Sequence, residues 1–155
     1  MKKSLFLLGL CIMMCMSSVN VSAGEKEENY FLVEEEFSVH ENCSIEVAPY
    51  TQYLMDVQTT IARLEPGKVG IRAHVYCTTT MSNIDITFYL QKKSGSSWAT
   101  VGTGRATASN VSDVGRSVST TAVSSGTYRG KVVARVTDKY GYSESMTSFS
   151  GSITI

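Results

Sequence analysis

From Tyr50 onward, apolar and polar residues alternate along the chain, which is the pattern of β-strands with one buried face. In KVGIRAHVYC (68–77), the apolar set is Val69, Ile71, Ala73, Val75 and Cys77. NIDITFYLQ (83–91) repeats the pattern with Ile84, Ile86, Phe88 and Leu90, and GTYRGKVVARVTD (126–138) repeats it with Tyr128, Val132, Ala134 and Val136. Each segment is therefore predicted to be a strand with one solvated face.

Turn signals stand between these segments. Glu65-Pro66-Gly67-Lys68 suits a type II turn, because proline presets the first central residue and glycine accepts the positive φ of the second. Ser94-Gly95-Ser96 predicts a hairpin into WATVG, and Asp138-Lys139-Tyr140-Gly141 leads into a last strand that ends in GSITI. About seven short strands predict an all-β fold, a single antiparallel β-sandwich, with a small β-barrel as the alternative.

The beginning of the chain predicts export. Lys2 and Lys3 precede an apolar run from Leu5 to Met16, and Val21-Ser22-Ala23 has the small residues of a signal-peptidase site. We therefore expect residues 1–23 to be a signal peptide. Cleavage after Ala23 would leave 132 residues, enough for one domain.

Charge divides the rest of the chain into two parts. Residues 24–49 hold eight acids and one base, whereas residues 50–155 hold six acids and eleven bases. The first part is predicted to be an acidic N-terminal extension and the second a sandwich domain. A solvated leader is one interpretation of the extension. The other is an arm that folds back along a basic face of the domain.

Part of the domain resembles immunoglobulin-like and fibronectin-type domains. Ser125-Gly126-Thr127-Tyr128 looks like the tyrosine-corner strand of that family, and Cys77 looks like the cysteine of its second strand. The resemblance covers about Met55 to Ile155 and implies an immunoglobulin-like sandwich. The chain departs from it in two places, because Gly130 stands where the second cysteine is expected and Phe88 stands where a core tryptophan is expected.

The segment LQKKSGSSWATV (90–101) also looks like hairpins of secreted and surface proteins of Gram-positive bacteria. Taken whole, the chain is similar to a family of small uncharacterised secreted proteins from such bacteria. That resemblance implies secretion and brings no activity with it.

The histidines and cysteines after residue 39 are His40, Cys43, His74 and Cys77. A single tetrahedral zinc site is disfavoured, because His74 and Cys77 lie three residues apart and would point to opposite faces of a strand. A disulfide between Cys43 and Cys77 is the favoured interpretation in an exported chain. It would close a loop of 35 residues and would stabilise the fold by ~4 kcal/mol. Free buried thiols remain the alternative.

Catalytic constellations are lacking in the sequence. The acids after residue 50 stand singly, mostly near predicted turns, and are expected to be solvated: Asp56, Glu65, Asp85, Asp113, Asp138 and Glu144. The serines of 94–125 have no histidine beside them to act as a base. We predict no catalytic residue, no metal and no cofactor.

Two surface features are candidates for binding. Tyr140, Gly141 and Tyr142 form a candidate binding loop in the last hairpin, because tyrosine offers a flat apolar ring with a polar tip. A candidate basic face would form if the outer sides of two strands adjoin, and its members are Lys68, Arg72, Arg129, Lys131 and Arg135. Ordinary solvated strand edges are the plainer interpretation of these bases.

The sequence thus predicts a secreted, extracellular, non-enzymatic binding module whose partner is a glycan, a wall polymer or a protein. It predicts no nucleic-acid partner and no membrane attachment after signal cleavage, and it leaves the oligomeric state open. The alternative is a structural, self-assembling protein, in which residues 34–47 add as a strand to a neighbour's sheet edge.

Overall fold

The computed structural model describes residues 52–121 and 123–155, and it describes Phe31–Leu32 and Cys43–Glu46 as backbone only. Seven long strands make up the domain: β3 (Leu54–Glu65), β4 (Lys68–Met81), β5 (Asn83–Ser94), β6 (Ser97–Ala108), β7 (Val111–Thr120), β8 (Thr127–Thr137) and β9 (Ser143–Thr154). The described residues include no helix long and apolar enough to cross a membrane.

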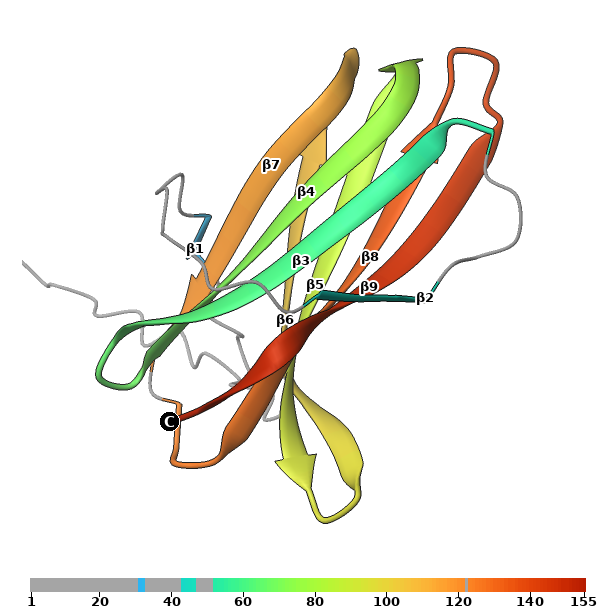
Figure 1. The fold of residues 1–155 in the computed structure, drawn as a ribbon. Coiled ribbons are helices and arrows are strands. Elements are labelled where there is room, and N and C mark those ends of the chain that lie inside the picture. Colours follow the sequence, from blue (N-terminus) through green and yellow to red (C-terminus); the bar gives the residue numbers. More distant parts are fainter. Residues whose placement is uncertain (1–30, 33–42, 47–51, 122) are drawn as a thin grey trace, which may run out of the picture.

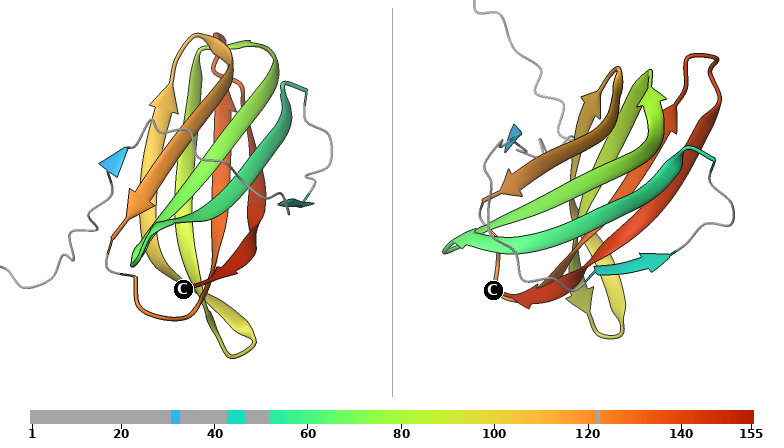
Figure 2. Two further views of the ribbon diagram at one scale, coloured as in Figure 1. Left: turned by 60° about the vertical axis from the view of Figure 1, so that its left-hand side comes forward. Right: turned by 45° about the horizontal axis from the view of Figure 1, so that its top comes forward.

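The strands form two antiparallel sheets that pack face to face (Figure 1). One sheet has the order β7-β4-β3 and the other the order β9-β8-β5-β6. The two views of Figure 2 show both layers, with the tip of the β5–β6 hairpin projecting beyond the rest of the sandwich. The predicted antiparallel sandwich of about seven strands is confirmed. The strands in the described part of the chain close no barrel, so the alternative fold is wrong.

Two short segments of the N-terminal extension continue the sheets at their edges. β1 (Phe31–Leu32) pairs antiparallel with β7, and β2 (Cys43–Glu46) pairs antiparallel with β9. The rest of the extension and the predicted signal peptide lie outside the described residues. Backbone pairing of this kind satisfies N–H and C=O groups that a bare sheet edge leaves open.

The alternating apolar residues meet between the sheets as the sequence predicts. Ile84, Ile86, Phe88 and Leu90 are each at most 2% exposed, and Phe88 is fully buried where the family resemblance expects a tryptophan. Cys77 is only half-buried and packs against the edge of this core. The predicted turns also form, because Gly67 has a φ of +75° between β3 and β4, and Gly95 has a φ of +61° between β5 and β6.

Tyr128 makes the hydrogen bond of a tyrosine corner. Its hydroxyl donates to the backbone carbonyl of Ser124 at 2.6 Å, while its ring is buried in the core. The cysteine assignment of the resemblance, in contrast, is wrong. A Cβ on Gly130 would lie 2.9 Å from Cγ2 of Ile71, so the residue that faces Gly130 across the sandwich is Ile71, not Cys77. The methyl group of Ile71 fills the space that a side chain at position 130 would need.

The carboxylate of Glu144 ties the two sheets together at one end of the sandwich. Its two oxygens accept hydrogen bonds from the backbone N–H groups of Gln52, Tyr53 and Leu54, at 2.7, 2.9 and 3.0 Å. Burial by itself raises the pKa of Glu144, but the three N–H donors outweigh burial and lower the pKa below its usual value. The expectation that this acid is a solvated turn residue is therefore wrong.

We predict that Glu144→Gln lowers the free energy of unfolding by about 1 to 2 kcal/mol at neutral pH, because an amide replaces a charged acceptor. The folded pKa is depressed, so the stabilisation is present above the ordinary carboxyl pKa and is lost as pH falls through the folded pKa. Urea unfolding between pH 7 and pH 3 measures this. The difference between the native chain and the variant should shrink as the pH falls below about 4.5.

Tyr128→Phe is the matched control for this measurement. It also removes one hydrogen bond, but the Tyr128–Ser124 pair contains no carboxylate. Its cost, about 1 kcal/mol, should stay constant over the same acidic range. A Glu144→Gln cost that is likewise constant with pH would contradict the assigned role of the carboxylate.

Candidate functional site

A pocket opens at the end of the sandwich where three connections between strands meet. Its volume is about 360 Å³, near the lower limit for small-molecule sites. The lining residues come from the segment directly before β3, the end of β4, the β4–β5 and β6–β7 connections and the β8–β9 loop: Tyr53, Thr79, Thr80, Ser82, Asn110, Asp138, Lys139 and Tyr140. In immunoglobulin-like sandwiches, loops that cluster at one end are a common place for recognition.

The β8–β9 loop is held in one shape by Asp138. Oδ1 of Asp138 accepts hydrogen bonds from the backbone N–H groups of Tyr140 and Tyr142, at 2.8 and 2.9 Å. The backbone N–H of Asp138 donates to the carbonyl of Tyr142 at 2.9 Å, and Gly141 takes a φ of +88° that L side chains rarely adopt. Asp138 is an acid beside a turn, and its carboxylate orders the loop.

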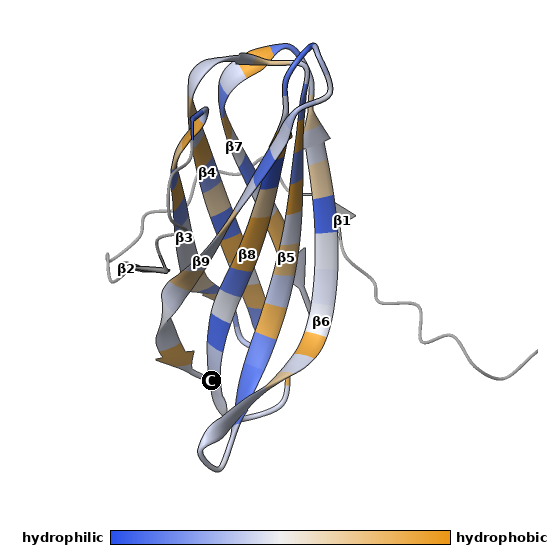
Figure 3. Cartoon of the chain, turned by 90° about the vertical axis from the view of Figure 1, so that its right-hand side faces the viewer, coloured by the Kyte–Doolittle hydropathy of each residue, from blue (hydrophilic) through white to orange (hydrophobic). Residues whose placement is uncertain are grey.

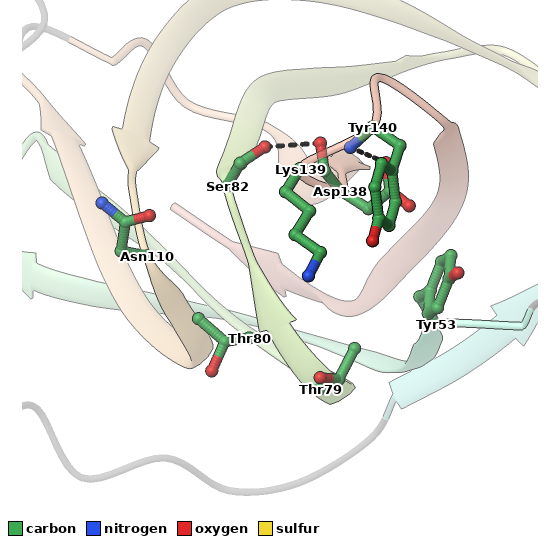
Figure 4. Close-up of a pocket in the computed structure, with 8 residues that line it drawn as sticks. All are labelled: Tyr53, Thr79, Thr80, Ser82, Asn110, Asp138, Lys139 and Tyr140. Atoms are coloured by element: carbon green, nitrogen blue, oxygen red, sulfur yellow. Dashed lines mark hydrogen bonds between the residues drawn. The ribbon is translucent and has the colours of Figure 1, made fainter.

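The floor of the pocket carries this loop. The hydroxyl of Ser82 lies within hydrogen-bonding distance of two backbone carbonyls, Thr137 at 2.8 Å and Asp138 at 2.7 Å. Figure 4 shows Lys139 in the middle of the pocket, with Asn110 on one side and Tyr53 and Tyr140 on the other. The loop is thus fixed to both the β4–β5 connection and its own hairpin.

Tyrosine rings form one wall of the site. Tyr140 is 83% exposed and Tyr142 is 54% exposed, so both rings are presented to solvent. The ring of Tyr142 packs edge-on against Tyr53, with centroids 5.9 Å apart, and the amino group of Lys139 lies 4.9 Å from the centroid of Tyr140. The candidate binding loop Tyr140–Gly141–Tyr142 is therefore an exposed, ordered feature beside the pocket. No local pattern in the sequence marked Tyr53, because its place in the site depends on long-range contacts.

The candidate basic face does not form as one surface. Lys68 and Arg72 belong to β4, whereas Arg129, Lys131 and Arg135 belong to β8 in the opposite sheet. The outward side chains of the two strands therefore point to opposite sides of the sandwich. Lys68 lies 3.8 Å from Glu65, and Arg72 lines a small cavity of about 170 Å³ with His74 and two other residues of the same face.

His74 is occupied by its neighbours on the outer side of the three-stranded sheet. Its ring stacks on Tyr76 with centroids 4.2 Å apart, and Nε2 lies 3.4 Å from Oδ1 of Asp113. The described residues contain no group of three side chains suited to hold a metal ion. His40 lies outside the described residues, as does the side chain of Cys43.

Among the side chains that the structure describes, Cys77 has no disulfide partner, and it lies in the part of β4 near Glu144. β2 places the backbone of Cys43 opposite Ser150, six residues beyond Glu144 on β9. Six residues of strand span ~20 Å, whereas a disulfide joins Cα atoms at most ~7 Å apart. This register is unfavourable for the predicted Cys43–Cys77 disulfide, which stays a prediction because the side chain of Cys43 is not described.

We expect Cys77 to react slowly with iodoacetamide. Burial, together with the negative charge of Glu144, raises the pKa of the Cys77 thiol to about 11. At pH 8 this pKa reduces the thiolate population, and hence the alkylation rate, about 100-fold or more relative to an ordinary cysteine. The rate for the Cys77 peptide, read by mass spectrometry in the folded and the urea-unfolded chain, measures this. Equal rates would contradict it.

The same samples test the predicted disulfide. If Cys77 resists alkylation in urea until a reductant is added, and the Cys43 peptide behaves likewise, the two cysteines are bonded. Alkylation of both peptides in urea without reductant shows two thiols instead.

Comparison with known proteins assigns no activity to this pocket. Comparisons of the chain with protein-family models, with curated proteins and with solved structures found no match. Any function proposed for the chain therefore depends on the geometry of the described residues.

Proposed function

We propose that the chain is a secreted, non-enzymatic binding module that recognises a glycan with the loop end of its sandwich. The observation that carries the proposal is the pocket in which an exposed tyrosine ring, Tyr140, stands beside a polar floor and a lysine. Sugars match such a surface, because their apolar ring faces stack on aromatic rings while their hydroxyl groups need hydrogen-bonding partners at the edges.

The polar lining supplies those partners. Thr79, Thr80 and Asn110 are exposed and bring two hydroxyls and an amide to the pocket, and Lys139 adds an ammonium group. The lysine favours a sugar that bears a carboxylate or another acidic group. With about 360 Å³, the pocket has room for a terminal unit of a chain rather than for a long polymer.

The pocket's one described acid is held by the backbone, which favours binding of a glycan over its hydrolysis. A glycosidase needs two carboxyl groups that flank one bond. Asp138 is the one acid among the described residues that line the pocket, and its Oδ1 is already engaged by two backbone N–H groups. Secretion is supported by the signal-like residues 1–23 and by the resemblance to small secreted proteins of Gram-positive bacteria.

A glycan array probed with the full chain tests this function, and we expect binding to glycans with an acidic terminal sugar. Tyr140→Ala should weaken binding of the best ligand at least about tenfold, because it removes the stacking ring. Tyr140→Phe keeps the ring and should stay within about threefold of the native chain.

Val101→Ala is the matched control, because Val101 is an exposed apolar side chain on β6 that does not line the pocket. Equal losses for Val101→Ala and Tyr140→Ala, or an array without any ligand, would overturn the proposal. Thermal unfolding of each variant shows whether a loss of binding reflects a loss of fold.

A second candidate function is self-assembly by strand exchange. It is favoured by the pairing of β1 and β2, which are parts of the extension, with the edge strands β7 and β9. A segment that adds to the edge of its own sheet can add to the same edge of another copy, since the hydrogen bonds are identical.

Assembly through the extension predicts a mass that rises with protein concentration and that becomes monomeric when residues 24–49 are deleted. Light scattering after size-exclusion chromatography measures both chains. A native chain that stays monomeric over a 100-fold range of concentration would rule this function out.

A further inference from the structure

The outer side of the sheet β9-β8-β5-β6 is the second surface that the structure organises. Figure 3 views this sheet from outside and shows hydrophilic bands on β5, β6 and β8. We call the outward residues of β5, β6, β8 and β9 the four-strand face. Its basic members are Lys93, Arg105, Arg129, Lys131 and Arg135.

Aromatic rings hold two of these bases in place. The guanidinium of Arg129 lies 4.4 Å from the ring centroid of Trp98 and 4.5 Å from that of Phe149. Its Nε donates to Oε1 of Gln91 at 2.9 Å. A planar guanidinium stacked in this way keeps its N–H donors at its edge, in a fixed direction.

Lys131 is held in the next row of the sheet. Register places it between Tyr89 of β5 and Phe149 of β9. Its amino group lies 5.6 Å from the centroid of Tyr89 and 5.8 Å from that of Phe149. The rings restrict the side chain before any ligand arrives, which lowers the entropic cost of binding.

Charge distinguishes the two outer sides of the sandwich. On β5, β6, β8 and β9, five bases share the four-strand face with one acid, Asp85. Glu46 of β2 stands in register with Thr147 at the edge of this sheet. The opposite sheet has four bases and three acids: Lys68 lies 3.8 Å from Glu65, Arg72 lies on the same face as Asp56 and Asp113, and the other two bases are Arg63 and Arg116. The positive charge of the domain is therefore concentrated on one side.

We propose that the four-strand face binds a linear acidic polysaccharide along β8. Arg129, Lys131 and Arg135 follow one another on that strand, over a length of ~20 Å. Threonine side chains stand among the bases and offer hydroxyl groups for sugar hydroxyls: Thr87, Thr107 and Thr147. Fixed cations among hydroxyls match a polymer that carries carboxylates or sulfates between its sugar rings.

A single-stranded nucleic acid fits this face less well. Such ligands gain affinity by stacking bases on open aromatic faces. Here the guanidinium of Arg129 lies over the rings of both Trp98 and Phe149. The rings thus position cations, and the contact with a ligand is made by charge and by hydroxyl groups.

Binding of the full chain to heparin, a linear sulfated polysaccharide, and to polygalacturonate, a carboxylated one, tests the proposal. We expect the dissociation constant for at least one of them to rise at least about tenfold when salt is increased from about 50 to about 300 mM, because screening weakens charge contacts. A single-stranded oligodeoxynucleotide of equal charge should bind more weakly than the polysaccharide.

The charge variants are designed in matched pairs. Lys131→Gln with Arg135→Gln should weaken polysaccharide binding at least about tenfold, whereas Lys68→Gln with Arg72→Gln, which removes the same charge from the other sheet, should change it less than about twofold. Arg105→Gln with Arg135→Gln alters two exposed side chains. This second double variant should also weaken polysaccharide binding, and it replaces the first as the test if the first fails to fold.

Three results would overturn the proposal. The first is no binding of either polysaccharide at low salt, the second is an equal loss in the variants of both sheets, and the third is tighter binding of the oligonucleotide. Tyr140→Ala should leave polysaccharide binding by the four-strand face unchanged, so this inference and the proposed function of the pocket succeed or fail separately.

Discussion

The carboxylate of Glu144 is the interaction on which the loop end of the sandwich depends. It binds three successive backbone N–H groups at the beginning of β3, although Gln52 and Glu144 are 92 residues apart in the chain. Because β3 and β9 belong to different sheets, this one side chain joins the two layers. The same carboxylate contributes to the raised pKa of Cys77, after the larger effect of burial. The first residues of β3 therefore have a fixed place relative to β9.

Tyr53 connects the Glu144 hydrogen bonds to the pocket, because it both binds Glu144 and lines the pocket. Its backbone N–H donates to Glu144, and its carbonyl accepts from the N–H of Thr78 at 2.8 Å. With the backbone held on both sides, the ring of Tyr53 meets Tyr142 of the β8–β9 loop. Asp138 then fixes the other end of that loop through the N–H groups of Tyr140 and Tyr142. The carboxylates of Glu144 and Asp138 thus hold the aromatic wall in place. Binding to a wall that is already ordered has a lower entropic cost.

Local pattern was sufficient to predict the strands, the turns and the inward side chains. Alternation along KVGIRAHVYC and NIDITFYLQ depends only on neighbouring residues, and the core contains those apolar side chains. Ser125-Gly126-Thr127-Tyr128 likewise carries the tyrosine corner within a few residues of sequence, and the corner forms. The exposure of Tyr140 and Tyr142 follows from their place in a hairpin loop.

What the sequence could not predict depends on which strands become neighbours. The basic residues of β4 and β8 would have formed one face only if the two strands adjoined, but β4 and β8 lie in different sheets. Glu144 looked like any acid near a turn, because its partners are distant in sequence and are backbone atoms, which carry no residue identity. The contacts of Trp98 and Phe149 with Arg129 could not be predicted for the same reason, since only the pairing of β6, β5, β8 and β9 brings these residues together.

Strand β8 connects the two proposed binding surfaces. It begins at the tyrosine corner, carries Arg129, Lys131 and Arg135 outward, and ends at Thr137, directly before the loop that Asp138 orders. Successive outward residues on a strand lie along one line. The sheet offers fixed charge along this line, whereas the loop offers a ring and a polar floor, so the two proposed surfaces differ in chemistry and are tested by separate variants.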